Sequence, residues 1–326
     1  MYSTLYGVRM SDLTVFSDVH LGKGTPTTEQ IRPSLSRALD GDIVVCCGDV
    51  FDTPWITGAV RVEDMQVLAD ELYDSMMISG RARTVVLLTG NHDITTDGRS
   101  ALRPFSKASN GRVFVVDEVL GGVWKFEERG TSYGFISWVK DLDTFKQRRD
   151  QLGKCDYLFC HQGVKGAHVN SVVMDGFPSD EIGKLAEVVF CGDYHEPNVI
   201  DNVVIPGSLT PLSFADADDR GFYTVNNSEL NFHPIEHPKF ITVRNRLPKK
   251  MDDRDYYRVV NPDPGVKSSP NVKVKQEVEG NTKVAGDSAP GKTISGMIRT
   301  YSESRGKPEM AKPGLIMWNR VTKDVA

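Results

Sequence analysis

The chain has 326 residues, of which 39% are hydrophobic and 25% are charged, and its formal net charge is −5 at pH 7. These proportions are those of an ordinary globular protein that is long enough to bury a sizeable core. The negative balance argues against a general nucleic-acid coat protein, but it permits a nuclease, whose metal site concentrates carboxylates.

The sequence also indicates where the protein resides. No run approaches the roughly 18 apolar residues of a membrane span, and the N-terminus lacks a signal-peptide pattern. The five cysteines are odd in number and include no CxxC pair, so we expect buried, reduced thiols instead of disulfides or zinc ligands. We therefore expect a cytoplasmic protein without a membrane partner.

Five segments in the first two-thirds of the chain share one pattern, an apolar strand followed by polar residues at its C-terminal end. They are residues 13–20, 42–52, 83–93, 155–163 and 187–195. Their apolar runs are too continuous for half-exposed strands, which predicts strands buried on both faces. Apolar residues at helical spacing predict a helix within 58–78, and 121–139 predicts a hairpin. The combination predicts an α/β sandwich with central sheets and flanking helices.

The composition changes after about residue 235. Two short strand-like segments, FITVRNRL and DYYRVVNPD, predict a small second domain, and residues 261–292 have the Pro, Gly and Ser content of a linker. Four apolar residues then follow at i, i+3, i+4 and i+7, which predicts a short amphipathic helix: Ile294, Met297, Ile298 and Tyr301. This helix could dock on a partner or pack on its own domain.

Each of the five predicted strands ends in side chains that can bind a metal ion. They are Asp18, His20, Asp49, Asn91, His92, Asp93, His161, Asp193 and His195. Ligands of α/β proteins collect outside the carboxyl ends of the strands, so these chain-distant groups can converge. Any one of them could instead cap a turn or a helix, but separate caps do not explain the ordered recurrence. The pattern predicts one shared metal site.

Five short motifs in this chain resemble those of the calcineurin-like metallophosphoesterases: SDVHLGKG, GDVFDTP, TGNHD, FCHQG and GDYHEP. More narrowly, GDVFDTP and IPGSLTPLSFADADDRGFYTV resemble the SbcD-type DNA double-strand-break nucleases and their phage recombination-endonuclease counterparts. The resemblance covers about residues 11–240. It implies an α/β fold, a four-layer α/β/β/α sandwich with a small α+β capping domain. The implied boundaries are 1–238 for the nuclease domain, 239–285 for the cap and 286–326 for a linker and docking segment.

The resemblance also implies a centre of two divalent metal ions, with Mn²⁺ expected and Mg²⁺ or Fe²⁺ as alternatives. By the family pattern, one ion is held by Asp18, His20, Asp49 and His195. The second is held by Asp49, which bridges, and by Asn91, His161 and the residue at 193. The pattern places two residues in the catalytic set: His92, which assists cleavage of the phosphate bond, and Asp93, which orients His92 or its turn.

Asp193 is the departure from this pattern, because the family has a histidine there. A carboxylate is a competent ligand for Mn²⁺ or Mg²⁺ and adds one negative charge. We therefore expect the second metal site to persist with harder ligands.

The function implied by the resemblance is that of an exonuclease and endonuclease in DNA recombination, repair and replication. Its implied partners are DNA (duplex ends and single strands), an SbcC-like coiled-coil ATPase docked on Ile294, Met297, Ile298 and Tyr301, and a second copy in a homodimer. A phage-encoded protein would act in the host cytoplasm. Two alternatives remain: a metallophosphatase or small-molecule phosphodiesterase of the same superfamily, and a non-catalytic subunit with an altered metal site.

Overall fold

The computed structural model describes residues 13–276 apart from 53, 110, 170–171, 217–218 and 227–228. The predicted docking helix with Ile294, Met297, Ile298 and Tyr301 lies outside the described residues, as does the end of the predicted cap. The chain divides into two compact units. Of the described residues, the first unit contains 13–210 and Arg220–Ile235, and the second contains Pro211–Asp219 and 236–276.

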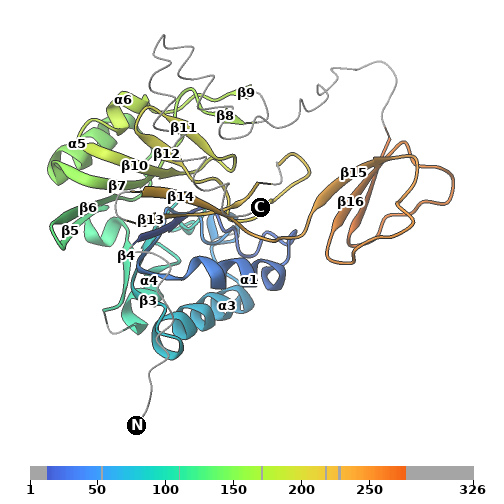
Figure 1. Cartoon of the computed structure of the whole chain (residues 1–326), viewed down its shortest axis with the longest axis horizontal. Coiled ribbons are helices and arrows are strands. Elements are labelled where there is room, and N and C mark those ends of the chain that lie inside the picture. Colours follow the sequence, from blue (N-terminus) through green and yellow to red (C-terminus); the bar gives the residue numbers. More distant parts are fainter. Residues whose placement is uncertain are drawn as a thin grey trace. The chain divides into compact units, whose positions relative to one another are not determined.

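The first unit contains a six-stranded sheet in the order β14-β13-β1-β2-β3-β4 (Figure 1). Its strands are β1 (Leu13–Phe16), β2 (Gly41–Cys46), β3 (Ala82–Leu88), β4 (Val113–Val116), β13 (Gly221–Asn226) and β14 (Glu229–Pro234). β1 to β4 run parallel, and β13 pairs antiparallel with β1. Every residue of β1 and β2 is buried, as expected for parallel strands that are covered on both faces.

A second six-stranded sheet has the order β11-β12-β10-β7-β6-β5. Its strands are β5 (Val123–Glu128), β6 (Thr131–Ile136), β7 (Cys155–His161), β10 (Ala186–Gly192), β11 (Asn198–Ile200) and β12 (Val203–Ile205). β7 and β10 are parallel neighbours, with Cys160 opposite Cys191. β5 and β6 form the predicted hairpin, which turns at Arg129 and Gly130, both of positive φ.

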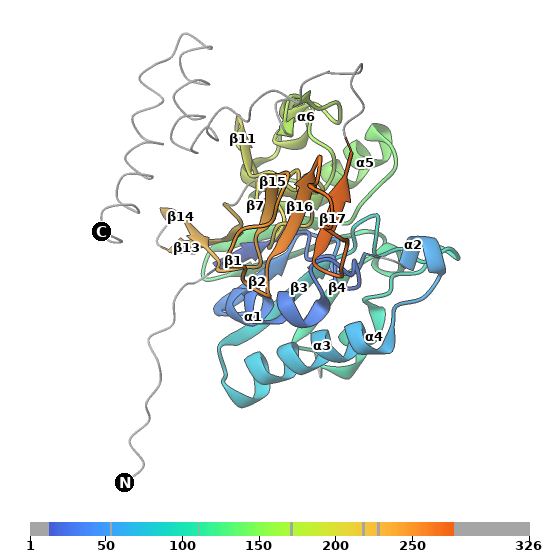
Figure 2. The same ribbon diagram turned by 90° about the vertical axis from the view of Figure 1, so that its right-hand side faces the viewer.

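Helices cover the outer face of each sheet (Figures 1 and 2). The helices are α1 (Thr28–Ala38), α2 (Pro54–Thr57), α3 (Val62–Tyr73), a π-helical turn (Asp74–Ile78), α4 (Arg103–Ala108), a 3₁₀ turn (Glu118–Leu120), α5 (Leu142–Leu152) and α6 (Ser179–Ile182). Ile31 of α1 and Leu68 of α3 pack in one core cluster with Val44 of β2. Phe145 of α5 and Ile182 of α6 belong to another cluster, with Leu158 of β7. None of the described helices is long and apolar enough to cross a membrane.

Aromatic side chains fill the space between the two sheets. Phe135, Phe159 and Phe190 stack across neighbouring strands of the second sheet, with ring centroids 4.9 and 5.6 Å apart. Phe190 also contacts Tyr223 of β13, in the first sheet, at 6.4 Å. The order is therefore helices, sheet, sheet and helices, which confirms the predicted four-layer α/β/β/α sandwich.

The helix predicted within 58–78 begins later than its apolar spacing suggested. Gly58 has φ of +74° and follows the short α2, so α3 starts only at Val62. The five cysteines are buried free thiols, as predicted. A two-stranded ribbon of β8 (His168–Val169) and β9 (Val172–Val173) completes the described elements of the first unit.

The second unit contains a parallel three-stranded sheet in the order β15-β16-β17. Its strands are β15 (Phe240–Arg244), β16 (Tyr256–Val260) and β17 (Val272–Lys275). Tyr257, Val259 and Val272 form its small core. Among residues 236–276 the structure contains these strands and loops but no helix.

Candidate metal centre

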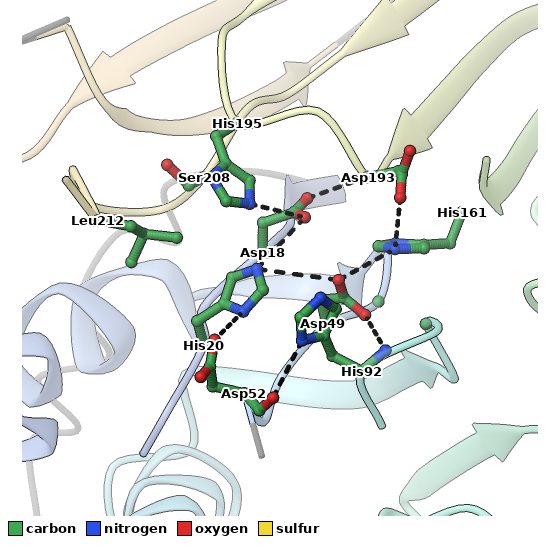
Figure 3. A network of polar contacts seen from close by, with 12 residues as sticks. Asp18, His20, Asp49, Asp52, His92, His161, Asp193, His195, Ser208 and Leu212 are labelled. Atoms are coloured by element: carbon green, nitrogen blue, oxygen red, sulfur yellow. Dashed lines mark hydrogen bonds and ion pairs between the residues drawn. The ribbon is translucent and has the colours of Figure 1, made fainter. Parts of the chain in front are cut away.

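The predicted ligands converge at the carboxyl ends of five strands (Figure 3). Asp18 and His20 follow β1, Asp49 follows β2, and Asn91 and His92 follow β3, all in the first sheet. The second sheet contributes three more residues: His161 is the last residue of β7, and Asp193 and His195 follow β10. The site thus lies where the strand ends of both sheets meet.

Four of these residues have backbone conformations that L-amino acids rarely adopt. The φ angles of Asp18, His20 and Asp49 are +52°, +52° and +53°, and that of Asp193 is +106°. Positive φ costs a non-glycine residue roughly 1–3 kcal/mol and persists where the surrounding structure enforces it. Here it turns each side chain inward at the end of its strand.

The first group of ligand atoms gathers around His20. Its Nε2 atom lies 3.8 Å from Asp18 Oδ1 and 3.8 Å from Asp49 Oδ2, and His195 Nε2 lies 3.9 Å from Asp18 Oδ1. His20 Nε2 and Asp18 Oδ1 are buried and have no hydrogen-bond partner among the described residues. Buried polar atoms are nearly always paired, so two such atoms facing each other suit a shared cation.

The second group gathers around His161. Its Nε2 atom lies 3.0 Å from Asn91 Oδ1, 3.3 Å from Asp49 Oδ2 and 3.8 Å from Asp193 Oδ1. The Nδ1 atom of His161 lies 2.6 Å from the carbonyl oxygen of Cys47. Because a carbonyl only accepts hydrogen bonds, Nδ1 carries a proton, and Nε2 is the atom at which His161 would bind a metal ion.

The residues therefore fit the two divalent cations that the fold implies. Ligand atoms about 2.1 Å from one ion lie within roughly 4.2 Å of each other, and all the separations above are shorter. Asp49 Oδ2 belongs to both groups, which is the position of a bridging carboxylate. The first ion would be held by Asp18, His20, Asp49 and His195, and the second by Asp49, Asn91, His161 and Asp193. The ligand roles remain predictions.

The charges of the two groups shift one another's pKa values. Burial would lower the pKa of His20, but the carboxylates of Asp18 and Asp52 outweigh it and raise that pKa to about 9. Burial would raise the pKa of Asp18, but the surrounding imidazoles hold it well below its usual range. Burial raises the pKa of Asp193 to about 6, although His161 acts in the opposite direction.

His92 lies beside the first group. Its main-chain N–H donates to Asp49 Oδ1 at 2.9 Å, and its ring meets the His20 ring edge-on with centroids 4.9 Å apart. Its Nδ1 lies 3.0 Å from the carbonyl oxygen of Asp52 and therefore carries the proton. The Nε2 atom of His92 is then the position where a proton can be taken up or delivered.

Asp93 is fully buried and supports the loop ends beneath the ligands. Its carboxylate accepts hydrogen bonds from the main-chain N–H groups of Phe51 at 2.9 Å and Gly90 at 3.0 Å. Burial and the nearby charge of Asp49 raise its pKa to about 7. Asp93 was predicted to orient either His92 or the turn that carries it. These main-chain contacts correspond to holding the turn, so Asp93 is a positioning residue.

Two residues that the sequence reasoning missed complete the site. Asp52 Oδ1 lies 2.9 Å from His20 Nδ1 and 3.3 Å from Lys23 Nζ. The only sequence signal for Asp52 is its place three residues after Asp49 in GDVFD. Lys23 lies in the SDVHLGKG segment and brings a positive charge next to the first group.

Residues 12–197 match the family described as calcineurin-like phosphoesterase. The chain is similar to several solved structures, among them that of a novel archaeal phosphodiesterase. That protein is 14% identical, and the alignment covers 68% of this chain and 99% of that one, with a TM-score of 0.36. The protein TT1561 of Thermus thermophilus is 13% identical, and the alignment covers 68% of this chain and 97% of that one, with a TM-score of 0.43.

A third similar structure is a putative 5'-nucleotidase from Staphylococcus aureus in complex with alpha-ketoglutarate. It is 15% identical, and the alignment covers 68% of this chain and 52% of that one, with a TM-score of 0.36. The comparison with curated proteins finds no match. The family match extends over more than half of the chain and includes the seven predicted metal ligands. The chain therefore belongs to the calcineurin-like phosphoesterases, a family of metal-dependent phosphoester hydrolases.

Proposed function

We propose that this metal-dependent phosphoesterase is a DNA nuclease of the SbcD type, with exonuclease and endonuclease activity in recombination, repair and replication. The observation that carries the hydrolytic part is the pair of ligand groups that share Asp49, with His92 beside them. Two such groups suit the hydrolysis of a phosphodiester, whose attacking and leaving oxygens both need stabilisation.

Each residue at the centre has a defined task in this chemistry. Two divalent cations, when bound, supply Lewis acidity and positive charge at the scissile phosphate. Asp49 fixes the spacing of the two ligand groups, since one of its oxygens belongs to both. His92 holds a proton at Nδ1 against the Asp52 carbonyl, and its Nε2 can deliver a proton or a hydrogen bond to the leaving oxygen.

The donor set supports Mn²⁺ as the metal of the second group. Asp49, Asn91 and Asp193 offer oxygen, and His161 offers nitrogen. Carboxylate and amide oxygens suit Mn²⁺ and Mg²⁺, and an imidazole favours Mn²⁺ over Mg²⁺.

The choice of DNA as substrate is supported by the sequence resemblance and by the second unit. Residues 239–275 contain ten Lys and Arg against four Asp and no Glu, whereas the whole chain carries a net charge of −5. A local basic excess in an acidic protein is the electrostatic footprint expected for a polyanionic ligand.

One face of the three-stranded sheet carries two of these basic side chains next to an aromatic ring. Side chains alternate along strands, so Tyr257 and Val259 face the core while Arg258 faces the other way. The Arg258 guanidinium lies 4.9 Å and Lys273 Nζ 5.9 Å from the ring centroid of Phe214. Basic groups interleaved with aromatic rings favour contact with nucleic-acid phosphates and bases.

The experiment is a comparison of three substrates with Mn²⁺: end-labelled linear duplex DNA, bis-p-nitrophenyl phosphate and p-nitrophenyl phosphate. A DNA nuclease digests DNA and the diester, and charge removal by Arg258→Gln with Lys273→Gln slows DNA digestion while the diester rate stays constant. Lys107→Gln, which removes a charge in the last turn of α4, is the control for the double variant. Hydrolysis of the monoester without DNA digestion would refute the nuclease and indicate a phosphatase.

We also propose an SbcC-like ATPase partner, a homodimeric assembly and a phage source, all of which rest on the sequence resemblance. Deletion of residues 286–326 should leave DNA digestion intact and abolish binding to the ATPase. Unchanged ATPase binding by the truncated chain would refute the docking role of Ile294, Met297, Ile298 and Tyr301.

A further inference from the structure

A single loop residue, Asp52, contacts two of the three histidines at the first group, His20 and His92 (Figure 3). Its Oδ1 atom lies 2.9 Å from His20 Nδ1, and its main-chain oxygen lies 3.0 Å from His92 Nδ1. The main-chain N–H of Asp52 donates to the carbonyl of Leu21 at 2.9 Å, which fixes the loop beside the end of β1. The side chain of Asp52 is 16% exposed.

These contacts determine which nitrogen of each ring faces the centre. A carboxylate and a carbonyl only accept hydrogen bonds, so the Nδ1 atoms of both rings carry protons. Each ring must then turn its Nε2 atom away from Asp52. For His20, that atom is the buried one that lies 3.8 Å from Asp18 Oδ1 and 3.8 Å from Asp49 Oδ2.

We propose that Asp52 is a positioning residue that sets the orientation and ligand strength of His20 while its main chain holds the ring of His92. A carboxylate on the far nitrogen of a ligating imidazole fixes the tautomer and strengthens the ligand. Asp52 therefore controls the metal affinity of the first group and leaves the second group unaffected. The inference rests on the proposed metal centre and is independent of DNA being the substrate.

Lys23 modulates this effect from the solvent side. Its Nζ shares Oδ1 of Asp52 with the imidazole, and its side chain is 31% exposed. A partly exposed ion pair contributes at most about fivefold to an equilibrium constant, so Lys23 is not the main determinant of His20 orientation. Asp52 and Lys23 are thereby separable by mutation: Lys23→Met removes the ammonium and leaves the carboxylate on His20.

The experiment titrates Mn²⁺ into the metal-free full chain by calorimetry and compares Asp52→Asn, Asp52→Leu and Lys23→Met with the wild type. His195→Ala and Asn91→Ala, which each remove a ligand from one group, assign the two binding phases. Asp143→Asn, the same change on the exposed first turn of α5, is the matched control. The ¹⁵N shifts of His20 in the Zn²⁺-loaded protein give the tautomer directly.

We expect Asp52→Asn to lower the Mn²⁺ affinity of the first group alone by about 10-fold, and Asp52→Leu to lower it by about 100-fold. Lys23→Met should change the Mn²⁺ affinity of the first group by no more than about fivefold. In the wild type, Nδ1 of His20 carries the proton. Equal weakening of both phases by Asp52→Asn, or no weakening, would overturn the proposal, as would a proton on Nε2. A wild type that binds no metal would instead refute the proposed metal centre.

Discussion

His161 Nδ1 donates to the carbonyl oxygen of Cys47 at 2.6 Å, although the two residues lie 114 positions apart in the chain. Cys47 directly follows β2 of the first sheet, and His161 ends β7 of the second. The two sheets are therefore joined by a hydrogen bond to a predicted metal ligand. Any change that separates them at this point also displaces that ligand.

Gly48 lies against this bond. A Cβ atom at Gly48 would lie 2.3 Å from His161 Nδ1, and its φ is +105°. We predict that Gly48→Ala lowers the free energy of unfolding through both backbone strain and the clash with His161, and that the clash adds about 1–3 kcal/mol to the loss. The variant should also bind Mn²⁺ more weakly at the second group. Gly24→Ala is the control, because φ there is +88° and no atom lies within 4 Å of the added Cβ. Urea denaturation and Mn²⁺ titration measure both effects; equal losses in the two variants would show that the contact with His161 is unimportant.

His92→Gln tests proton delivery at the centre. Removal of a positioned general acid costs about 10²–10⁴-fold in kcat, so we expect a loss of this size on the bis-ester substrate with two metal ions still bound. The competing role is ligation, since His20, Asp49 and His92 also place ligand atoms close together. Loss of one metal ion from His92→Gln would make His92 a ligand and contradict the assignment of its role.

Asp193 tests the departure from the family pattern. Asp193→Asn removes a charge from the second group, and we expect Mn²⁺ affinity there to fall by about tenfold or more, because ligand charge sets affinity. Asp193→His supplies a nitrogen donor instead and should preserve two bound ions. Calorimetry with Asp143→Asn as a control measures both. Unchanged Mn²⁺ affinity in Asp193→Asn would show that Asp193 is not a ligand, and abolished binding in Asp193→His would contradict a second site that persists with a carboxylate in place of the histidine.

The pH dependence of metal binding follows from the pKa values of the ligands. Burial alone would lower the pKa of His20, but the carboxylates of Asp18 and Asp52 outweigh this effect and raise the pKa to about 9 in the metal-free protein. The ring is therefore protonated at pH 7. Metal ions bind the neutral ring, so binding releases a proton and Mn²⁺ affinity rises with pH by up to about tenfold per unit until pH 9. Below pH 6 the dependence steepens, since burial raises the pKa of Asp193 to about 6. Calorimetry in buffers of different ionisation enthalpy counts the protons, and a count of zero at pH 7 would contradict this account.

The same shift affects the metal-free fold. The pKa of His20 is raised above its unfolded value of 6.5, so its contribution to stability is fully present below pH 6.5 and is lost as pH rises towards 9. Bound metal replaces that contribution, so the stabilisation by metal is greatest at the alkaline end of this range.

Much of the fold and of the site could be predicted because strand ends leave a local signal. An apolar run that stops at a carboxylate or an imidazole identifies both the buried strand and the candidate ligand, as at Asp18 and Asp49. The glycine before a ligand has a physical reason as well: a Cβ at Gly90 would lie 2.2 Å from Asp49 Oδ1.

Other features depend on contacts that no local pattern encodes. Asp52 reaches His20 across 32 positions, and nothing in GDVFD indicates that its carboxylate faces a ring instead of solvent. β13 pairs with β1 although more than 200 residues separate them, so the strand order could not be derived from periodicity. The π-helical turn at Asp74–Ile78 continues the apolar spacing of α3 and is indistinguishable from it in sequence.

The measurement that tests the central claim most directly is the number of Mn²⁺ ions bound per chain, by calorimetry and elemental analysis, in the wild type and in Asp49→Ala. Because Asp49 Oδ2 belongs to both ligand groups, the account predicts two ions in the wild type and the weakening of both in the variant. His195→Ala should weaken the binding of the ion at the first group only. A wild type that binds a single ion, or an Asp49→Ala variant that keeps one site at full affinity, would contradict a shared two-ion centre.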